Sequence, residues 1–326
     1  MAMASAVTRA FRRIEGAIYK DPANRGIGKC FVNGAVGAAT TALISARSIL
    51  LTTGFFIASV NAGENDGPIG TAALARALAG AGKDVVVVTD DLNRPLVEAA
   101  LDAALSESRS TDVALEIYPT HDGGTASSGG ASPECLAFHT HIRETYAPTV
   151  AVAIERPGRT PDGSYRNMRA GDISAVTAPI DAMFLREPAF GFASSSLTTI
   201  GVGDGGNEIG MGSPAIRAAV LDAVPDADVT ATVVPTDITI ATGVSNWGGY
   251  ALAAGVAALT AAPGLAFPSH LDRAAMDAVN AVGGVDGVRA AVSMSVDDLD
   301  WHDHHRPLLD HLVSIATDAA PHPTSE

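Results

Sequence analysis

Short apolar runs alternate with helix-like segments through the first half of the chain. The apolar runs lie at Ser48–Thr53, Asp84–Asp90, Ala114–Pro119 and Thr149–Glu155, and the helix-like segments between them at Gly70–Ala81, Arg94–Leu105 and Glu134–Tyr146. Runs such as DVVVVTD lack polar alternation, which is typical of strands covered on both faces. The alternation therefore predicts an α/β fold: a mostly parallel, doubly wound, Rossmann-like sheet with helices on both faces and right-handed crossovers.

The second half of the chain is less regular. Thr198–Gly203 and Val229–Pro235 have the pattern of strands, and Trp247–Leu259 has that of a helix. Residues 1–20 predict an amphipathic helix rather than a targeting peptide, because they lack a continuous apolar core. Since no segment has the composition of a linker, we expect a single α/β domain over residues 1–326, with a core over 25–260 and a helical tail over 270–326.

Two segments stand apart from this pattern. The Gly/Ser-rich stretch Thr120–Ser132 predicts a surface insertion. The segment from His302 is rich in histidine, but it has no cysteine or carboxylate pair at a clear ligand spacing. A solvated terminal helix is therefore favoured there over a metal site.

Composition and charge narrow the choice of partners. The chain has 326 residues and a formal net charge of −15, with 36 acidic and 21 basic side chains. This balance argues against nucleic acid, and three lysines cannot form a polybasic membrane patch. No apolar run has the length of a membrane span. The two cysteines match no zinc pattern, and a reducing cytoplasm is the simplest expectation.

Polar residues gather in the loops that follow the predicted strands, where open α/β sheets bind ligands. The loop GDGGNEIGMG, at 203–212, is the sharpest of these, with five glycines around Asp204, Asn207 and Glu208. It matches neither a Walker A loop nor a dinucleotide fingerprint. Its acids suit an ammonium group, a proton transfer or a metal, and the alternative is a tight turn whose acids cap a helix.

A second group of candidates follows the fourth predicted strand. Glu155 ends a buried run, so desolvation is expected to raise its pKa unless Arg156 pairs with it in a structural ion pair. Arg156, Arg166 and Arg169 offer planar guanidinium groups that match a carboxylate ligand.

The remaining candidates lie at predicted turns and helix starts. Glu64 and Asp66 belong to an acidic turn in which Asp66 acts either on a ligand or as a helix cap. Asp90 ends the second predicted strand, and it too is expected either to contact a ligand or to cap a helix. Ser245 and Asn246 either cap the following helix or reach a ligand from its N-terminus.

Five ordered strings carry a resemblance to a known family. They are TGFFIASVNAGENDGPIG (53–70), VVVTDD (86–91), IERPGRTPDGSYRNMRAGDIS (154–174), IGVGDGGNEIGMG (200–212) and TGVSNWGGYAL (242–252). Together they resemble the D-glutamate cyclase family over most of the chain, from about residue 25 to residue 259. The resemblance implies a carbon–oxygen lyase that cyclises D-glutamate to 5-oxo-D-proline with loss of water.

That reaction needs a base, an acid and a group that stabilises an oxyanion. We expect Asp204 and Glu208 to act as base and ammonium ligand, and Glu155 as acid. Other residues are expected to bind the substrate: Arg156 and Arg169 through its carboxylates, Gly205, Gly206 and Asn207 at the oxyanion, and Glu64, Asp66, Asp90, Ser245 and Asn246 as further ligands.

The reaction moves no hydride, so we expect no nicotinamide, flavin or pyridoxal cofactor. Two other classes stay open. One is a metal-dependent enzyme acting on another small amino or hydroxy acid, with a divalent cation on Asp66, Asp90 and Asp204, since hard cations prefer oxygen ligands. The other is a small-molecule binding protein without turnover. Homo-oligomerisation is left open.

Overall fold

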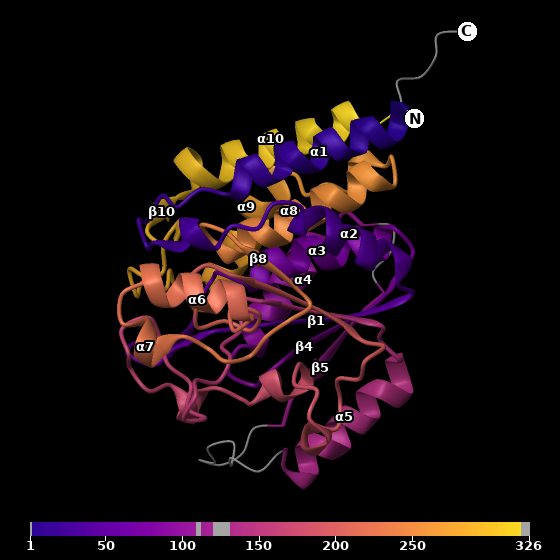
Figure 1. Cartoon of the computed structure of the whole chain (residues 1–326). Coiled ribbons are helices and arrows are strands. Elements are labelled where there is room, and N and C mark those ends of the chain that lie inside the picture. Colours follow the sequence, from indigo (N-terminus) through magenta and orange to yellow (C-terminus); the bar gives the residue numbers. More distant parts are fainter. Residues whose placement is uncertain (1, 109–111, 120–130, 321–326) are drawn as a thin grey trace, which may run out of the picture.

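Six parallel strands form the central sheet of the computed structural model, which describes residues 2–108, 112–119 and 131–320 (Figure 1). The strands are β1 (Ser48–Thr53), β4 (Asp84–Thr89), β5 (Val113–Ile117), β6 (Val150–Ile154), β7 (Thr198–Gly203) and β8 (Ile238–Ala241). Their order across the sheet is β5-β4-β1-β6-β7-β8, all neighbours being parallel. This is the Rossmann order, in which the chain reverses direction across the sheet between β1 and β6. The expected fold class is confirmed.

Alternate residues of the central strands pack into two separate cores. Val85 and Val87 of β4 join the large core on one face, whereas Val86 and Val88 join a smaller core on the other. Successive side chains of a strand point to opposite faces, so a run of valines is the pattern that a doubly covered strand requires.

Helices cover the large-core face in two layers (Figure 1). The inner helices are α2 (Ala35–Ser45), α3 (Pro68–Gly80), α4 (Arg94–Leu105), α8 (Ser245–Leu259) and α9 (Ser269–Ala281), and the outer ones are α1 (Ala2–Ile18) and α10 (Arg306–Ala319). The opposite face is covered by α5 (Pro133–Tyr146) and by the 3-10 turn η3 (Ile180–Met183). The 3-10 turns η2 (Ser174–Val176) and η4 (Pro188–Phe190) flank η3 and contain no buried residue. Smaller elements complete the described chain: η1 (Ile27–Cys30), α6 (Pro214–Ala223), α7 (Ala227–Thr230), η5 (Pro263–Leu265), the hairpins β2 (Phe56–Ile57) with β3 (Ala62–Gly63) and β9 (Ser295–Val296) with β10 (Leu299–Asp300), and the π-helical turn η6 (Trp301–His305).

The predicted strand at Val229–Pro235 is wrong. Its first residues belong to α7, and the sixth strand of the sheet is β8. The backbone after α7 forms hydrogen bonds with loops and not with a neighbouring strand. The Thr232 amide donates to the Gly206 carbonyl, and the Val233 amide donates to the Arg159 carbonyl. This segment therefore braces the loop after β7, and its apolar pattern reflects burial against that loop.

The C-terminal segment is only partly the solvated helix that was expected. His302 and His304 are exposed, but His305 is buried and its Nδ1 accepts a hydrogen bond from Trp247 Nε1 at 3.0 Å. The bond ties the outer helical layer to α8.

Residues 120–130 of the expected insertion lie outside the described residues. In the described part of the chain, no helix is both long and apolar enough to cross a membrane.

Candidate active site

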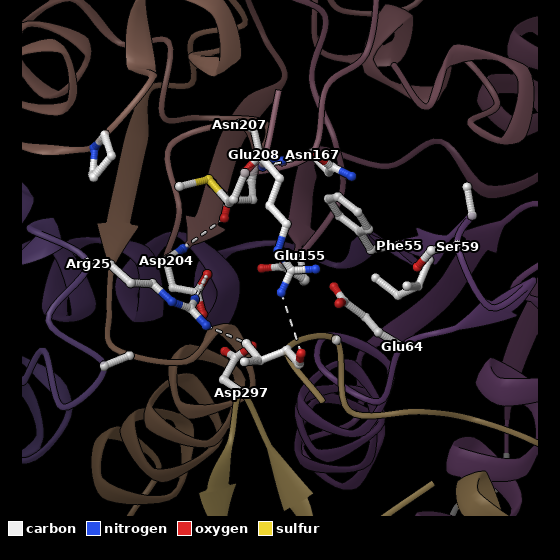
Figure 2. Close-up of a pocket in the computed structure, with 18 of the residues that line it drawn as sticks. Arg25, Phe55, Ser59, Glu64, Glu155, Asn167, Asp204, Asn207, Glu208 and Asp297 are labelled. Atoms are coloured by element: carbon white, nitrogen blue, oxygen red, sulfur yellow. Dashed lines mark hydrogen bonds and ion pairs between the residues drawn. The ribbon is translucent and has the colours of Figure 1, made fainter. Parts of the chain in front are cut away.

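A cavity of about 290 Å³ opens at the carboxyl ends of β1, β6 and β7, next to the switch point of the sheet (Figure 2). Ligands of open α/β sheets bind at this place, and the volume is near the lower end of the range for small-molecule pockets. Its walls come from the loops after the three strands, from residues 23–25, from Pro225, and from the C-terminal residues 287–288 and Asp297. The lining residues are Ala23, Asn24, Arg25, Phe55, Ile57, Ala58, Ser59, Glu64, Glu155, Asn167, Met168, Arg169, Asp204, Asn207, Glu208, Pro225, Gly287, Val288 and Asp297.

Acidic side chains dominate the described lining. Five of its residues are carboxylic acids (Glu64, Glu155, Asp204, Glu208 and Asp297), against two arginines, Arg25 and Arg169. All five acids are buried. So many carboxylates cannot all be ionised in one desolvated space, and such a site either retains protons or binds a cationic group.

Arg25 is a partly buried cation whose guanidinium contacts two of these acids. Its guanidinium pairs with Asp204 Oδ1 at 2.8 Å and with Asp297 Oδ1 at 2.9 Å. The Asp21 carboxylate fixes the turn by accepting hydrogen bonds from the amides of Arg25 and Gly26. Gly26 has φ +87°, and a Cβ there would lie 2.4 Å from the Ala223 carbonyl oxygen. Sequence reasoning missed Arg25, although this turn pattern, an acid before Arg-Gly, was a usable signal.

Asp297 was also missed. It stands at the two-residue tip of the β9–β10 hairpin, where Asp297 and Asp298 have φ of 55° and 63°. Asp and Asn tolerate this left-handed conformation best after glycine, so the Asp-Asp pair between short apolar segments was a readable turn signal. Asp286 anchors the hairpin, because its Oδ2 accepts hydrogen bonds from Ser295 Oγ and from the Asp298 amide.

The glycine-rich loop wraps around the carboxylate of its own Glu208. The amides of Asp204 and Gly205 donate to Glu208 Oε1 at 3.1 and 2.7 Å, and the amide of Gly206 donates to Oε2 at 2.7 Å. The expectation that the Gly205 and Gly206 amides face an oxyanion is therefore wrong, since both are already bound. Asn207 lines the cavity, and its Nδ2 donates to the Arg166 carbonyl.

Glu155 follows β6 with a strained backbone. Its φ is 48°, in the left-handed region that a residue of this type seldom occupies. Ser245 Oγ donates to Glu155 Oε2 at 2.5 Å. Burial, followed by the charges of Asp204 and Glu208, raises the pKa of Glu155 well above its ordinary value.

Asp66 and Asn246 cap each other's helices. The Asp66 carboxylate accepts hydrogen bonds from the amides of Ser245 and Asn246 at the start of α8. The Asn246 Oδ1 accepts from the amides of Gly67 and Gly70 at the start of α3. Asp66 therefore caps a helix distant in sequence, and its Oδ1 also accepts a hydrogen bond from the Gly67 amide before its own helix α3, at 3.0 Å. Burial, then the charge of Asp297, raises the pKa of Asp66 to about 8. Ser245 and Asn246 are fully buried behind the cavity, not in its lining.

Two predicted ligands are paired away from the cavity. Arg156 is buried and its Nη1 lies 2.6 Å from Asp90 Oδ2, while its other bonds go to the carbonyls of Gly54 and Ala178. Neither Arg156 nor Asp90 lines the cavity, which corrects the expectation that both touch substrate. Arg169 does line it, and its Nη2 donates a long hydrogen bond to the Val288 carbonyl, at 3.5 Å.

Within the described ranges, two clusters of three acids have carboxylate oxygens within 4.8 Å of one another: Asp66 with Asp204 and Asp297, and Glu155 with Asp204 and Glu208. The first of these contains two of the three expected metal ligands, Asp66 and Asp204. Its third member is Asp297, not the expected Asp90. Asp204 Oδ2 and Asp297 Oδ2 are buried without a hydrogen-bond partner among the residues described. Buried oxygens of this kind suit a cationic ligand.

The fold and the site together define a Rossmann-like α/β protein with a buried, carboxylate-lined small-molecule site at its switch point. Residues 14–313 match the family model described as "D-glutamate cyclase-like, C-terminal". The chain is 33% identical to the human protein named "D-glutamate cyclase, mitochondrial" over 336 aligned residues, which cover 94% of this chain and 52% of that protein. The chain therefore belongs to the D-glutamate cyclase-like family, and it spans about half the length of this relative.

Proposed function

We propose that the protein is a lyase that cyclises D-glutamate to 5-oxo-D-proline and water. Family membership supports a cyclase, and one observation supports this substrate: the buried carboxylates converge on a cavity with an arginine near its rim. The acids suit the substrate ammonium group, and Arg169 suits a substrate carboxylate.

The chemistry divides among groups that the structure brings together. Asp204 Oδ1 is bound by Arg25, whereas its Oδ2 has no partner among the described residues, so Oδ2 can receive a proton from the ammonium group. The freed amine attacks the γ-carboxyl carbon, a C–N bond forms and a C–O bond breaks. A neutral acid near the same carbon must protonate the departing oxygen, and Glu155 is the acid that sequence reasoning favours.

We expect turnover of D-glutamate and much slower turnover of L-glutamate. Arg169 and the acids lie at fixed places around the cavity, so inverting the α-carbon moves the amine away from its base when the carboxylates stay bound. Chiral chromatography of 5-oxoproline, against an enzyme-free control, measures both rates. Equal rates would contradict the stereochemical assignment, and no product from either enantiomer would leave the binding protein as the better reading.

The second candidate function is binding of a divalent cation. The cluster of three carboxylates formed by Asp66, Asp204 and Asp297 supports it. Three carboxylates and Arg25 together carry a charge of −2 when all are ionised, which a divalent cation neutralises. Such a site fits a metal-dependent enzyme of small amino or hydroxy acids.

Binding of Mn²⁺, followed by isothermal titration calorimetry at pH 8, tests this candidate. If the cation binds there, Asp297→Asn is expected to weaken binding at least tenfold. The matched control is Asp298→Asn, since Asp298 is the exposed neighbour that pairs with Arg289. Equal binding by the two variants would remove the candidate.

Two further expectations accompany the proposed function. A cytoplasmic location and the absence of a nicotinamide, flavin or pyridoxal cofactor stay predictions from the sequence. The human relative is named as a mitochondrial protein.

A further inference from the structure

We propose that Asp297, rather than Glu208, is the residue that holds the substrate ammonium group together with Asp204, and that this pair selects ligands with a primary amine. The inference rests on the proposed cyclisation and names the residues that recognise the amine. Both aspartates line the cavity, and Figure 2 shows both of them beside Arg25.

Three residues of the cavity lining have a buried side-chain oxygen that receives no hydrogen bond within the described chain. The atoms are Asp204 Oδ2, Asp297 Oδ2 and Asn207 Oδ1, in residues that are 3%, 7% and 2% exposed. All three atoms are acceptors. Buried acceptors in native proteins nearly always have a partner, so these oxygens indicate a ligand that brings donors into the cavity. With both carboxylates ionised, D-glutamate has no donor other than its ammonium group.

The acceptor of Asn207 shows that the excess of acceptors extends beyond the acids. Its Nδ2 donates to the Arg166 carbonyl at 2.8 Å, and because a carbonyl can only accept, Oδ1 is the end of the amide without a partner. Residue 205 is glycine, and a Cβ there would lie 3.0 Å from Asn207 Oδ1 and 2.7 Å from Met168 Sδ. The missing side chain therefore leaves space beside this acceptor. The expected role of Asn207 as a donor to an oxyanion does not fit this orientation.

Arg25 orients the two aspartates in the same way. Its Nη1 lies 2.8 Å from Asp204 Oδ1 and its Nη2 lies 2.9 Å from Asp297 Oδ1, so each carboxylate keeps its Oδ2 for a ligand. A carboxylate oxygen of Asp204 lies within 4.8 Å of one of Asp297. One nitrogen can donate to two oxygens up to about 5.6 Å apart, which is twice the length of a charge-assisted hydrogen bond. The pair is therefore close enough to bind a single ammonium nitrogen.

The two neighbouring acids are already bound by backbone amides. Glu208 accepts hydrogen bonds from three amides of its own loop, and Asp66 accepts from three amides at the starts of α3 and α8. A carboxylate has about four lone-pair positions, so these acids have little capacity left for a ligand. The expectation that Glu208 binds the ammonium group therefore passes to Asp297.

Binding of a matched pair of ligands tests the inference without turnover. D-2-amino-4-phosphonobutyrate has a phosphonate in place of the γ-carboxyl group, so it has no γ-carboxyl carbon for the amine to attack. The second ligand, 4-phosphonobutyrate, is the same molecule without the amine. In isothermal titration calorimetry with EDTA present, we expect the parent protein to bind the first ligand ~10–100-fold more tightly, because the second lacks the charged hydrogen bonds.

Asp297→Asn is expected to remove most of this preference. Asparagine can keep its carbonyl oxygen towards Arg25, but it places an NH₂ donor where Oδ2 was. We expect the aminophosphonate to bind ~10–100-fold more weakly to the variant, and the amine-free ligand to bind within threefold of its parent affinity. The matched control is Asp298→Asn, the exposed neighbour in the same hairpin, which should bind both ligands as the parent does. An unchanged preference in Asp297→Asn would overturn the inference, and so would an equal loss for both ligands.

A measurement on the parent protein decides the matter if Asp297→Asn does not fold. The N,N,N-trimethyl derivative of the aminophosphonate keeps the positive charge but has no N–H, and we expect it to bind at least ~10-fold more weakly than the primary amine. Equal binding of these two ligands, equal binding of the amine-containing and amine-free ligands, or binding of neither would overturn the inference. A preference that requires Mn²⁺ would also overturn it, by assigning the two aspartates to a metal. If the binding results are as expected but D-glutamate is not cyclised, the proposed function fails and the amine site stands.

Discussion

Asp204→Asn is expected to lower the rate of D-glutamate cyclisation by ~10²–10⁴-fold, the usual cost of losing a general base. Asparagine keeps the size of the side chain but cannot accept the proton of an ammonium group. The variant's kcat/KM is expected to lose the acidic limb of its pH profile, which marks the base. Steady-state measurements of 5-oxoproline from pH 5 to 9 record both effects.

The structure removes the main alternative reading of this residue. A helix-capping aspartate tolerates asparagine, but Asp204 caps no described helix, since one oxygen pairs with Arg25 and the other has no described partner. Asp298→Asn, in an exposed pair, controls for the general effect of removing a charge. A folded Asp204→Asn protein with near-normal turnover would move the base to Glu208.

The sequence predicted the fold well because the relevant signals are local. An apolar run such as the one at 84–89 predicts a buried parallel strand, and strand–helix alternation then allows few topologies. The carboxyl edge of such a sheet directs attention to Asp204, Glu208 and Glu155, and the structure does bring these three together. Local reasoning failed at Val229–Pro235, where burial against a loop gives the same apolar pattern as burial in a sheet.

Side-chain direction and long-range pairing were beyond such reasoning. Glu155 and Arg156 are adjacent in sequence, but the former faces the cavity and the latter points away to Asp90. Arg25 and Asp297 come from opposite ends of the chain, and only the tertiary fold joins them at Asp204. Ion pairs between residues distant in sequence produce no periodic pattern, so a single sequence does not predict them.

Arg25→Met is expected to destabilise the protein by about 3–5 kcal/mol near pH 8, because it leaves the buried Asp204 and Asp297 without their cation. Methionine has a similar length and fills similar space, so the loss is electrostatic. Chemical denaturation at pH 5 and at pH 8 gives the free energy of unfolding under both conditions. Arg289→Met, which breaks an exposed pair with Asp298, is the control and is expected to leave stability unchanged.

The sign of the pH dependence makes this expectation specific. Burial raises the pKa of Asp204 well above its ordinary value, and Arg25 is the group that opposes the shift. Above the unfolded pKa of about 4, Asp204 therefore holds more protons in the folded state than in the unfolded state, and its contribution to stability falls as pH rises. Removing Arg25 raises the folded pKa of Asp204 further and extends this fall to higher pH. The destabilisation should thus be small near pH 5, where Asp204 takes a proton in place of the guanidinium, and should grow towards pH 8. An equal loss at both pH values would show that Arg25 contributes packing rather than charge to the site.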